Sequence, residues 1–160
     1  MMTLRPITPE DDRELAAIIR KAFVTHHLDI PGTAYFDPEL DHLSSFYNAF
    51  PDRRSYLILE ERGRVSGGVG VAEFSTFPDT AEMQKLYLSD EVKGKGYGKL
   101  LVSLAEKEAL RLGYGQLYIE THSNFSIAVK MYSSLGFERI EKPSSVQHDT
   151  MNTFFIRKLH

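Results

Sequence analysis

The chain has 160 residues, of which 42% are hydrophobic and 26% are charged, and its formal net charge at pH 7 is -3. This composition is typical of one globular domain covering 1–160. It excludes a disordered chain and gives no electrostatic reason to expect nucleic acid or a membrane surface as a partner. The absence of cysteine excludes disulfides and thiolate chemistry, and the lack of an apolar leader or of a run of about 20 apolar residues leads us to expect a cytoplasmic protein.

The first predicted elements are a short strand at Leu4–Ile7 and a helix that ends at about Phe23. Thr8 is typical of a helix N-cap, and Pro9 is typical of the first helical position. Three acidic residues follow Pro9, where the partial positive charge of a helix start favours them, and apolar residues then recur at helical spacing. We therefore predict a helix that begins after Thr8.

A long irregular stretch, His26–Pro51, follows this helix and contains a short predicted helix near Glu39–Phe50. Loops of this length inside a compact domain are often functional. The segment His26–Asp41 is rich in acidic and aromatic residues, so it is either part of a pocket for a cationic amine or a solvated lid.

The rest of the chain reads as strands and two helices. A glycine-containing turn joins the first two of these strands, and apolar residues from Leu100 to Leu112 share one helix face, which Gly113 ends. The predicted strands are Ser55–Glu60, Val65–Phe74, Ala81–Leu88, Gln116–Thr121, Glu138–Ile140 and Thr153–Leu159, and the second helix is Ser126–Leu135. Hairpins come first and strand–helix–strand units later, which predicts a mixed α/β fold whose mostly antiparallel sheet carries helices on both faces.

The strongest local signal is a glycine-rich loop between a strand and an amphipathic helix. Glycines permit positive φ and close approach of the backbone to a ligand, and a helix N-terminus attracts anions. Lysines in the loop add full positive charges. The loop consists of Lys93, Gly94, Lys95, Gly96, Tyr97, Gly98 and Lys99. We predict a phosphate or pyrophosphate site here; the alternative is a surface turn with solvated lysines.

Two other phosphate-binding motifs fit this loop poorly. A P-loop places Ser or Thr after its lysine to bind magnesium, but Leu100 follows Lys99. A dinucleotide fingerprint needs a G-x-G-x-x-G spacing and a longer doubly wound fold after Gly98. Glu120 stands about where a ribose-binding acid would lie in that fold, and we discount it for this reason.

The loop resembles the acetyl-CoA motif [QR]-x-x-G-x-[GA] of the GNAT superfamily of N-acetyltransferases, with Lys93 in place of the usual Gln or Arg. A second stretch, Ala128–Phe137, is similar to the family's A-x-x-[LM]-Y-x-x-x-G-F element. Two motifs in the expected order are more specific than either alone, and the likeness extends over about Leu4–Leu159. The chain also resembles a bacterial subgroup that shares E-x-Q-K-[ML]-Y-L before the loop, a subgroup that indicates no acceptor.

The resemblance implies a role for each matching position. The backbone of Leu86, Tyr87 and Leu88 would bind the pantetheine amides of acetyl-CoA, and the glycine loop would hold its pyrophosphate. Tyr132 would protonate the departing thiolate. Many members carry Asn where this chain has Phe125, so Asn124 is the candidate for that pantetheine contact.

The residue chemistry adds candidates for deprotonating the amine. Some family members place a general-base glutamate at the position of Glu82, and burial of that carboxyl would raise its pKa toward neutrality. The alternative is that Glu82 only pairs with Lys85 or orders the strand. His122 and His148 are further candidates as substrate contacts or relays. The histidines show no metal-ligand spacing, so we predict no metal.

These observations predict an N-acetyltransferase that moves an acetyl group from acetyl-CoA directly to a primary amine of a small molecule or peptide, without an acyl-enzyme. Two alternatives stay open: a transferase that uses another acyl-CoA, and a catalytically silent CoA-binding sensor or interaction module. A homodimer is possible, because dimers are common among proteins that resemble this one.

Overall fold

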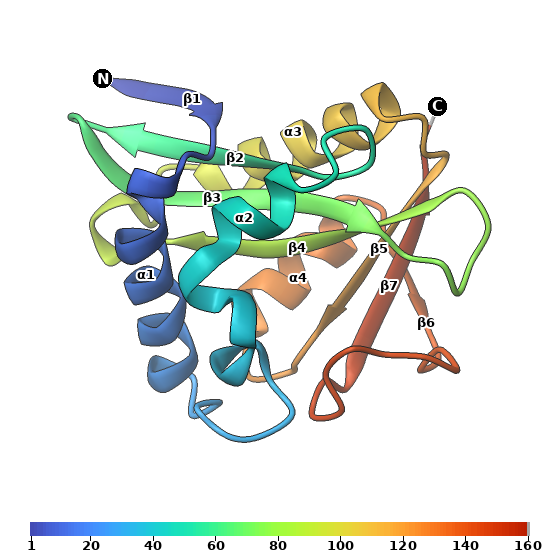
Figure 1. The fold of residues 1–160 in the computed structure, drawn as a ribbon. Helices are drawn as coiled ribbons and strands as arrows, with labels where there is room; N and C mark the ends of the chain where they lie inside the picture. Colours follow the sequence, from blue (N-terminus) through green and yellow to red (C-terminus); the bar gives the residue numbers. More distant parts are fainter. Residues whose placement is uncertain (160) are drawn as a thin grey trace.

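The computed structural model describes residues 1–159 as a seven-stranded sheet with the order β1-β2-β3-β4-β5-β7-β6 (Figure 1). Neighbouring strands are antiparallel, except that β4 and β5 are parallel. This confirms the predicted mixed, mostly antiparallel sheet. The strands are β1 (Met2–Pro6), β2 (Ser55–Glu61), β3 (Arg64–Glu73), β4 (Thr80–Leu88), β5 (Gln116–Thr121), β6 (Glu138–Ile140) and β7 (Thr153–Lys158).

Four α-helices cover the two faces of the sheet. Figure 1 shows α1 (Asp12–Thr25) and α2 (Leu43–Asn48) on one face, and α3 (Tyr97–Arg111) and α4 (Ser126–Ser134) on the other. Each face has its own buried apolar cluster, one built on α1 and α2 and the other on α3 and α4. The prediction of helices on both faces is therefore confirmed. None of the helices within residues 1–159 has the length and apolar character to cross a membrane.

The first helix begins later than predicted. Thr8 precedes a 3-10 turn, Pro9–Asp11, and α1 starts at Asp12 and runs to Thr25. The Asp11 carboxylate accepts the Thr8 backbone N–H at 2.8 Å, and Arg5 donates to both its oxygens at 2.8 and 2.7 Å. Thr8 is the N-cap of this turn and Pro9 lies at its start, as predicted, and these bonds hold the turn in 3-10 geometry before α1 begins.

The stretch from 26 to 51 is also more divided than predicted. The short helix near Glu39–Phe50 consists of a 3-10 turn, Pro38–His42, followed by α2. Another 3-10 turn, Ala34–Phe36, precedes them. Pro38 starts its turn with a fixed φ and no N–H to donate, which favours a break at this point.

Glycines of β3 make room for two tyrosines above the sheet. A Cβ atom at Gly70 would lie 2.6 Å from the Tyr56 ring and 2.7 Å from the Tyr47 ring. Both rings are almost fully buried, and their centroids lie 5.1 Å apart. Gly70 is therefore required for space and not for an unusual backbone conformation.

The parallel strands β4 and β5 stay paired over a short distance only. Their register covers Thr80–Glu82 of β4 and Gln116–Tyr118 of β5. Beyond Glu82, β4 continues to Leu88 with β3 as its paired neighbour. Lys85, with φ of 52°, lies at a bulge in this part of β4. The β4 edge that faces β5 is consequently free of strand partners from about residue 83 onward.

Candidate functional site

The glycine loop leads into α3 with its backbone exposed. Gly94 and Gly96 have φ of 78° and 81°, a left-handed conformation that favours glycine. Gly96 is the N-cap of α3 and no side chain caps this end of the helix. A Cβ atom at either glycine would meet nothing within 4 Å. The start of α3 is thus able to accept an anionic ligand, and the predicted phosphate site stays a prediction.

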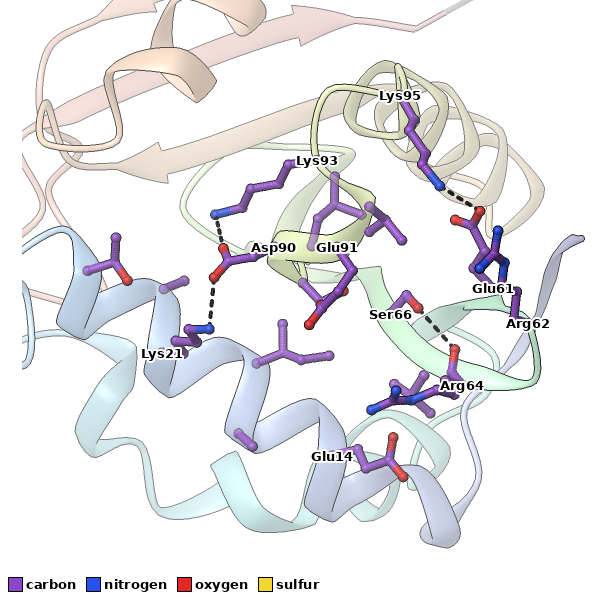
Figure 2. Close-up of a pocket in the computed structure, with 18 residues that line it drawn as sticks. Glu14, Lys21, Glu61, Arg62, Arg64, Ser66, Asp90, Glu91, Lys93 and Lys95 are labelled. Carbon is purple, nitrogen blue, oxygen red and sulfur yellow. Dashed lines mark hydrogen bonds and ion pairs between the residues drawn. The ribbon is translucent and has the colours of Figure 1, made fainter.

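Two lysines of the loop are held in ion pairs. Figure 2 shows Asp90 between Lys93 at 3.0 Å and Lys21 at 2.8 Å, and Lys95 at 2.8 Å from Glu61. Hydrogen bonds from Lys21 and Lys93 lower the pKa of Asp90 to about 2. The lysine side chains are 45% to 67% exposed, so these pairs contribute little to stability and can exchange for phosphate oxygens.

These ion pairs line a cavity of about 670 Å³ between α1 and the loop (Figure 2). Its wall carries five cationic and four acidic side chains, so the charges nearly balance. None of the residues lining it lines the two cavities beside Glu82. This large cavity therefore adjoins the glycine-rich loop and not the candidate base.

The segment of β4 before the loop contains Leu86, Tyr87 and Leu88, all half-buried. These residues lie on the part of β4 that is not paired with β5. Backbone N–H and C=O groups on this edge can pair with an extended amide-containing ligand, as they would with another strand. The geometry fits the expected pantetheine contact.

Glu82 lies where β4 and β5 separate, and it is 7% exposed. The Gln84 side-chain amide donates to its Oε1 at 2.9 Å, and the Tyr47 hydroxyl donates to the Gln84 Oε1 at 2.7 Å. Burial and the neighbouring Glu120 carboxylate raise the pKa of Glu82 to about 7. A carboxyl with this pKa is poised to accept a proton near neutral pH. The alternative pairing partner, Lys85, contacts Asp37 instead, at 3.0 Å.

Glu82 lines two cavities. One has a volume of about 320 Å³ and is bounded by side chains that include Phe46, Arg54 and Phe74. The other has about 50 Å³ and extends toward Tyr87. Because Glu82 faces both, a group in the larger cavity and a ligand along β4 could each approach this carboxyl.

Tyr132 lies on α4 and is 5% exposed. Its ring packs edge-on against Phe137 and Phe155. Burial raises the pKa of Tyr132 above its usual value near 10, and burial together with the nearby Tyr132 phenol raises the pKa of Tyr87. The Tyr132 hydroxyl therefore stays protonated at neutral pH and can donate a proton or a hydrogen bond.

Asn124 has a local structural contact. Its side-chain amide donates to the His26 carbonyl at 2.9 Å, and its backbone N–H donates to His122 Nδ1 at 3.0 Å. Phe125, at the position of the family's usual Asn, packs edge-on against Phe23. Asn124 thus connects the start of α4 to the end of α1, and its contact with pantetheine stays a prediction.

The structure brings together further residues that the sequence did not indicate. Glu120, which we discounted, accepts a hydrogen bond from Tyr118 at 3.0 Å and lies 3.3 Å from His148 Nδ1. Asp37 contacts His148 Nε2 at 2.7 Å and also pairs with Lys85. The parallel pairing of β4 with β5 could have indicated Glu120, because this pairing places Glu82 opposite Tyr118, two residues before Glu120.

Two carboxylates of the acidic loop form ion pairs within the chain. Asp37 is bound by Lys85 and His148, and Asp41 forms a two-bond pair with Arg20 at 2.7 and 2.8 Å. Both carboxylates have cationic partners within the chain, and a role of His26–Asp41 in binding a cationic acceptor stays a prediction.

Comparison with known proteins agrees with this geometry. A family model described as the acetyltransferase (GNAT) family matches residues 20–137. The Escherichia coli K12 protein named uncharacterized N-acetyltransferase YjgM is 32% identical over 140 residues, which cover 86% of this chain and 83% of that protein. A GNAT-family acetyltransferase from Staphylococcus aureus Mu50 aligns over 100% of both chains with a TM-score of 0.87 and 18% identity. A phosphinothricin acetyltransferase from Sinorhizobium meliloti, solved with acetyl-CoA, has a TM-score of 0.75 and 25% identity, covering 99% of this chain and 88% of its own.

Proposed function

This chain belongs to the GNAT family of acetyltransferases, and we propose that it transfers an acetyl group from acetyl-CoA directly to a primary amine of a small molecule or peptide. The observation that carries the proposal is Glu82, a buried carboxyl with a pKa of about 7 at the point where β4 and β5 separate. We further propose that 1–160 acts as one catalytic domain.

The residues around the β4 edge fit acetyl-CoA, which would supply an activated acetyl thioester. We assign the pantetheine contacts to the backbone of Leu86, Tyr87 and Leu88, with Asn124 as a further contact. We assign the pyrophosphate to Lys93–Lys99. Support comes from the left-handed Gly94 and Gly96 and from the uncapped start of α3, which together offer unpaired N–H groups to an anion.

Glu82 is assigned as the general base. An ammonium group must lose a proton before it can attack a carbonyl, and a carboxylate with a pKa near 7 is partly ionised at neutral pH. The amine would occupy the cavity of about 320 Å³, which Glu82 lines. Phe46 and Phe74 give this cavity apolar walls, and Gln84 fixes the carboxyl through a hydrogen bond.

Tyr132 is assigned as the acid that donates its hydroxyl proton to the departing sulfur. The raised pKa keeps the phenol protonated at working pH, which an acid requires. Packing against Phe137 and Phe155 leaves the ring little freedom, so the position of the hydroxyl is fixed.

A thiol-release assay with acetyl-CoA and a panel of primary amines tests this function. Because the chain has no cysteine, a thiol reagent reports only released CoA. We expect amine-dependent release in the wild type and strong loss in Glu82→Gln, with the exposed Glu10→Gln as the matched control. Acetyl-CoA binding by calorimetry without release for any amine would instead favour the silent binding module. Faster release from a longer acyl-CoA would identify another donor.

A further inference from the structure

A buried cluster of charged side chains joins three distant parts of the chain beside Glu82. His148, in the loop between β6 and β7, lies between Asp37 Oδ1 at 2.7 Å and Glu120 Oε1 at 3.3 Å. Lys85 Nζ lies 3.0 Å from Asp37 Oδ2. The four side chains are at most 11% exposed, so solvent screens their interactions weakly.

The charges in this cluster are unequal. Glu82, Lys85, Glu120 and His148 line the same cavity of about 50 Å³, and Asp37 adjoins it through its ion pairs. Three carboxyl groups therefore share two cationic partners. Asp37 and Glu120 contact these partners directly, whereas Glu82 accepts its hydrogen bond from the neutral amide of Gln84. Glu82 is the carboxyl left without a direct cation.

We propose that His148 and Glu120 are positioning residues that set the proton affinity of Glu82 in opposite directions. The positive His148 lowers this affinity by neutralising Glu120, and the negative Glu120 raises it. This inference rests on the proposed function for one point only: the role of Glu82 as general base gives the control of its proton affinity a catalytic purpose.

The ionisation of His148 supports this arrangement. Burial lowers the pKa of His148, but hydrogen bonds to Asp37 and Glu120 outweigh burial and raise the pKa to about 9. His148 is thus a cation at neutral pH. For Glu82, burial and Glu120 raise the pKa, while the Gln84 hydrogen bond, Lys85 and His148 lower it.

Arg54 and Glu73, which line the larger cavity beside Glu82, pair with each other at 2.7 Å, and three tyrosines around the cluster are neutral near pH 7. The Tyr118 hydroxyl donates to Glu120, the Tyr47 hydroxyl donates to Gln84, and Tyr87 lines the same cavity; the pKa of each tyrosine is raised. Gln147 reaches Glu39 Oε1 at 3.5 Å at the outer side of the loop. Glu120 therefore acts on Glu82 with one sign and the cations Lys85 and His148 with the other, and His148 is the cation that contacts Glu120 directly.

A carbon-13 NMR titration of the glutamate side-chain carboxyls tests the proposal without any acceptor or donor. The Glu82 and Glu120 signals are assigned by their loss in Glu82→Gln and Glu120→Gln. We expect a wild-type midpoint near 7 for Glu82. Glu120→Gln should lower this midpoint and His148→Gln should raise it, each by about one pH unit. The exposed His42→Gln should leave it unchanged.

Unchanged midpoints in both folded variants, or shifts in the same direction, overturn the proposal. If His148→Gln does not fold, Glu120→Gln decides alone, because a midpoint that fails to fall contradicts the assigned charge effect. Failure of the proposed function gives a different result. If Glu82→Gln stays active and keeps the acidic limb of its pH–rate profile, Glu82 is not the general base, but the NMR titration result still stands.

Discussion

Replacing His148 by Gln should destabilise the protein at pH 6 more than at pH 10. His148 is 11% exposed and lies between Asp37 and Glu120, which raise its pKa from 6.5 to about 9 in the folded chain. A raised pKa contributes stability that is fully present below the unfolded value and is lost as pH rises through the folded value. The stabilisation by His148 is therefore complete below about pH 6.5 and lost through about pH 9.

The size of this effect follows from the pKa difference. About 2.5 pH units at 1.36 kcal/mol each correspond to about 3 kcal/mol. Loss of His148 also tightens proton binding at Glu82, which offsets on the order of 1 kcal/mol at high pH. The destabilisation caused by His148→Gln should thus be larger at pH 6 than at pH 10 by about 2 kcal/mol.

Urea unfolding measures this difference. The chain has no tryptophan, so far-UV circular dichroism is the suitable signal. The free energies of unfolding of wild type, His148→Gln and the exposed control His42→Gln are compared at pH 6 and pH 10. Groups that titrate in the same way in all three proteins do not affect the differences between them. An equal loss of stability at both pH values would refute the reasoning, because it would mean that no proton on His148 bridges the two carboxylates.

Three further predictions concern the proposed reaction. Glu82→Gln should lower kcat by roughly 10- to 10⁴-fold and remove an acidic limb near pH 7 from the pH–rate profile, and a surviving limb would point to another base. Gly96→Glu forces a bulky residue into φ of 81° and adds a repelling charge, so calorimetry should show acetyl-CoA binding weakened by about 10-fold or more; unchanged affinity would contradict the loop assignment. Tyr132→Phe keeps the packed ring but removes the hydroxyl, so kcat should fall by about 10- to 10³-fold at nearly constant acetyl-CoA affinity, whereas a wild-type kcat would exclude the acid role.

The fold was largely predictable because apolar periodicity and turn residues act locally. Gly113 illustrates this: its φ of 95° ends α3 as the sequence indicated. The 3-10 form of the turn after Thr8 was not predicted, since it involves Arg5, which bonds Asp11 and is itself held by Glu60 of β2. Side-chain contacts of this kind are not visible in local spacing.

The candidate site divides in the same way. The positions of Glu82, Tyr132 and the glycine loop follow from motifs that are contiguous in sequence. The Asp37–His148 contact joins residues 111 positions apart, in two irregular loops, so no periodic pattern could indicate it. Glu120 was discounted because it was considered only against a dinucleotide-binding fold, in which a carboxylate at that distance from the glycines would have bound ribose.

The space above Gly70 has a consequence for how this protein tolerates mutation. A single methyl group at this position would push the Tyr47 ring, whose hydroxyl holds Gln84, whose amide in turn holds Glu82. Gly70 itself lines neither cavity beside Glu82. In a library that substitutes every amino acid at position 70, few replacements should therefore keep activity, as at a residue in contact with substrate. The reason would be the displaced carboxyl of Glu82, which Gly70 affects through Tyr47 and Gln84.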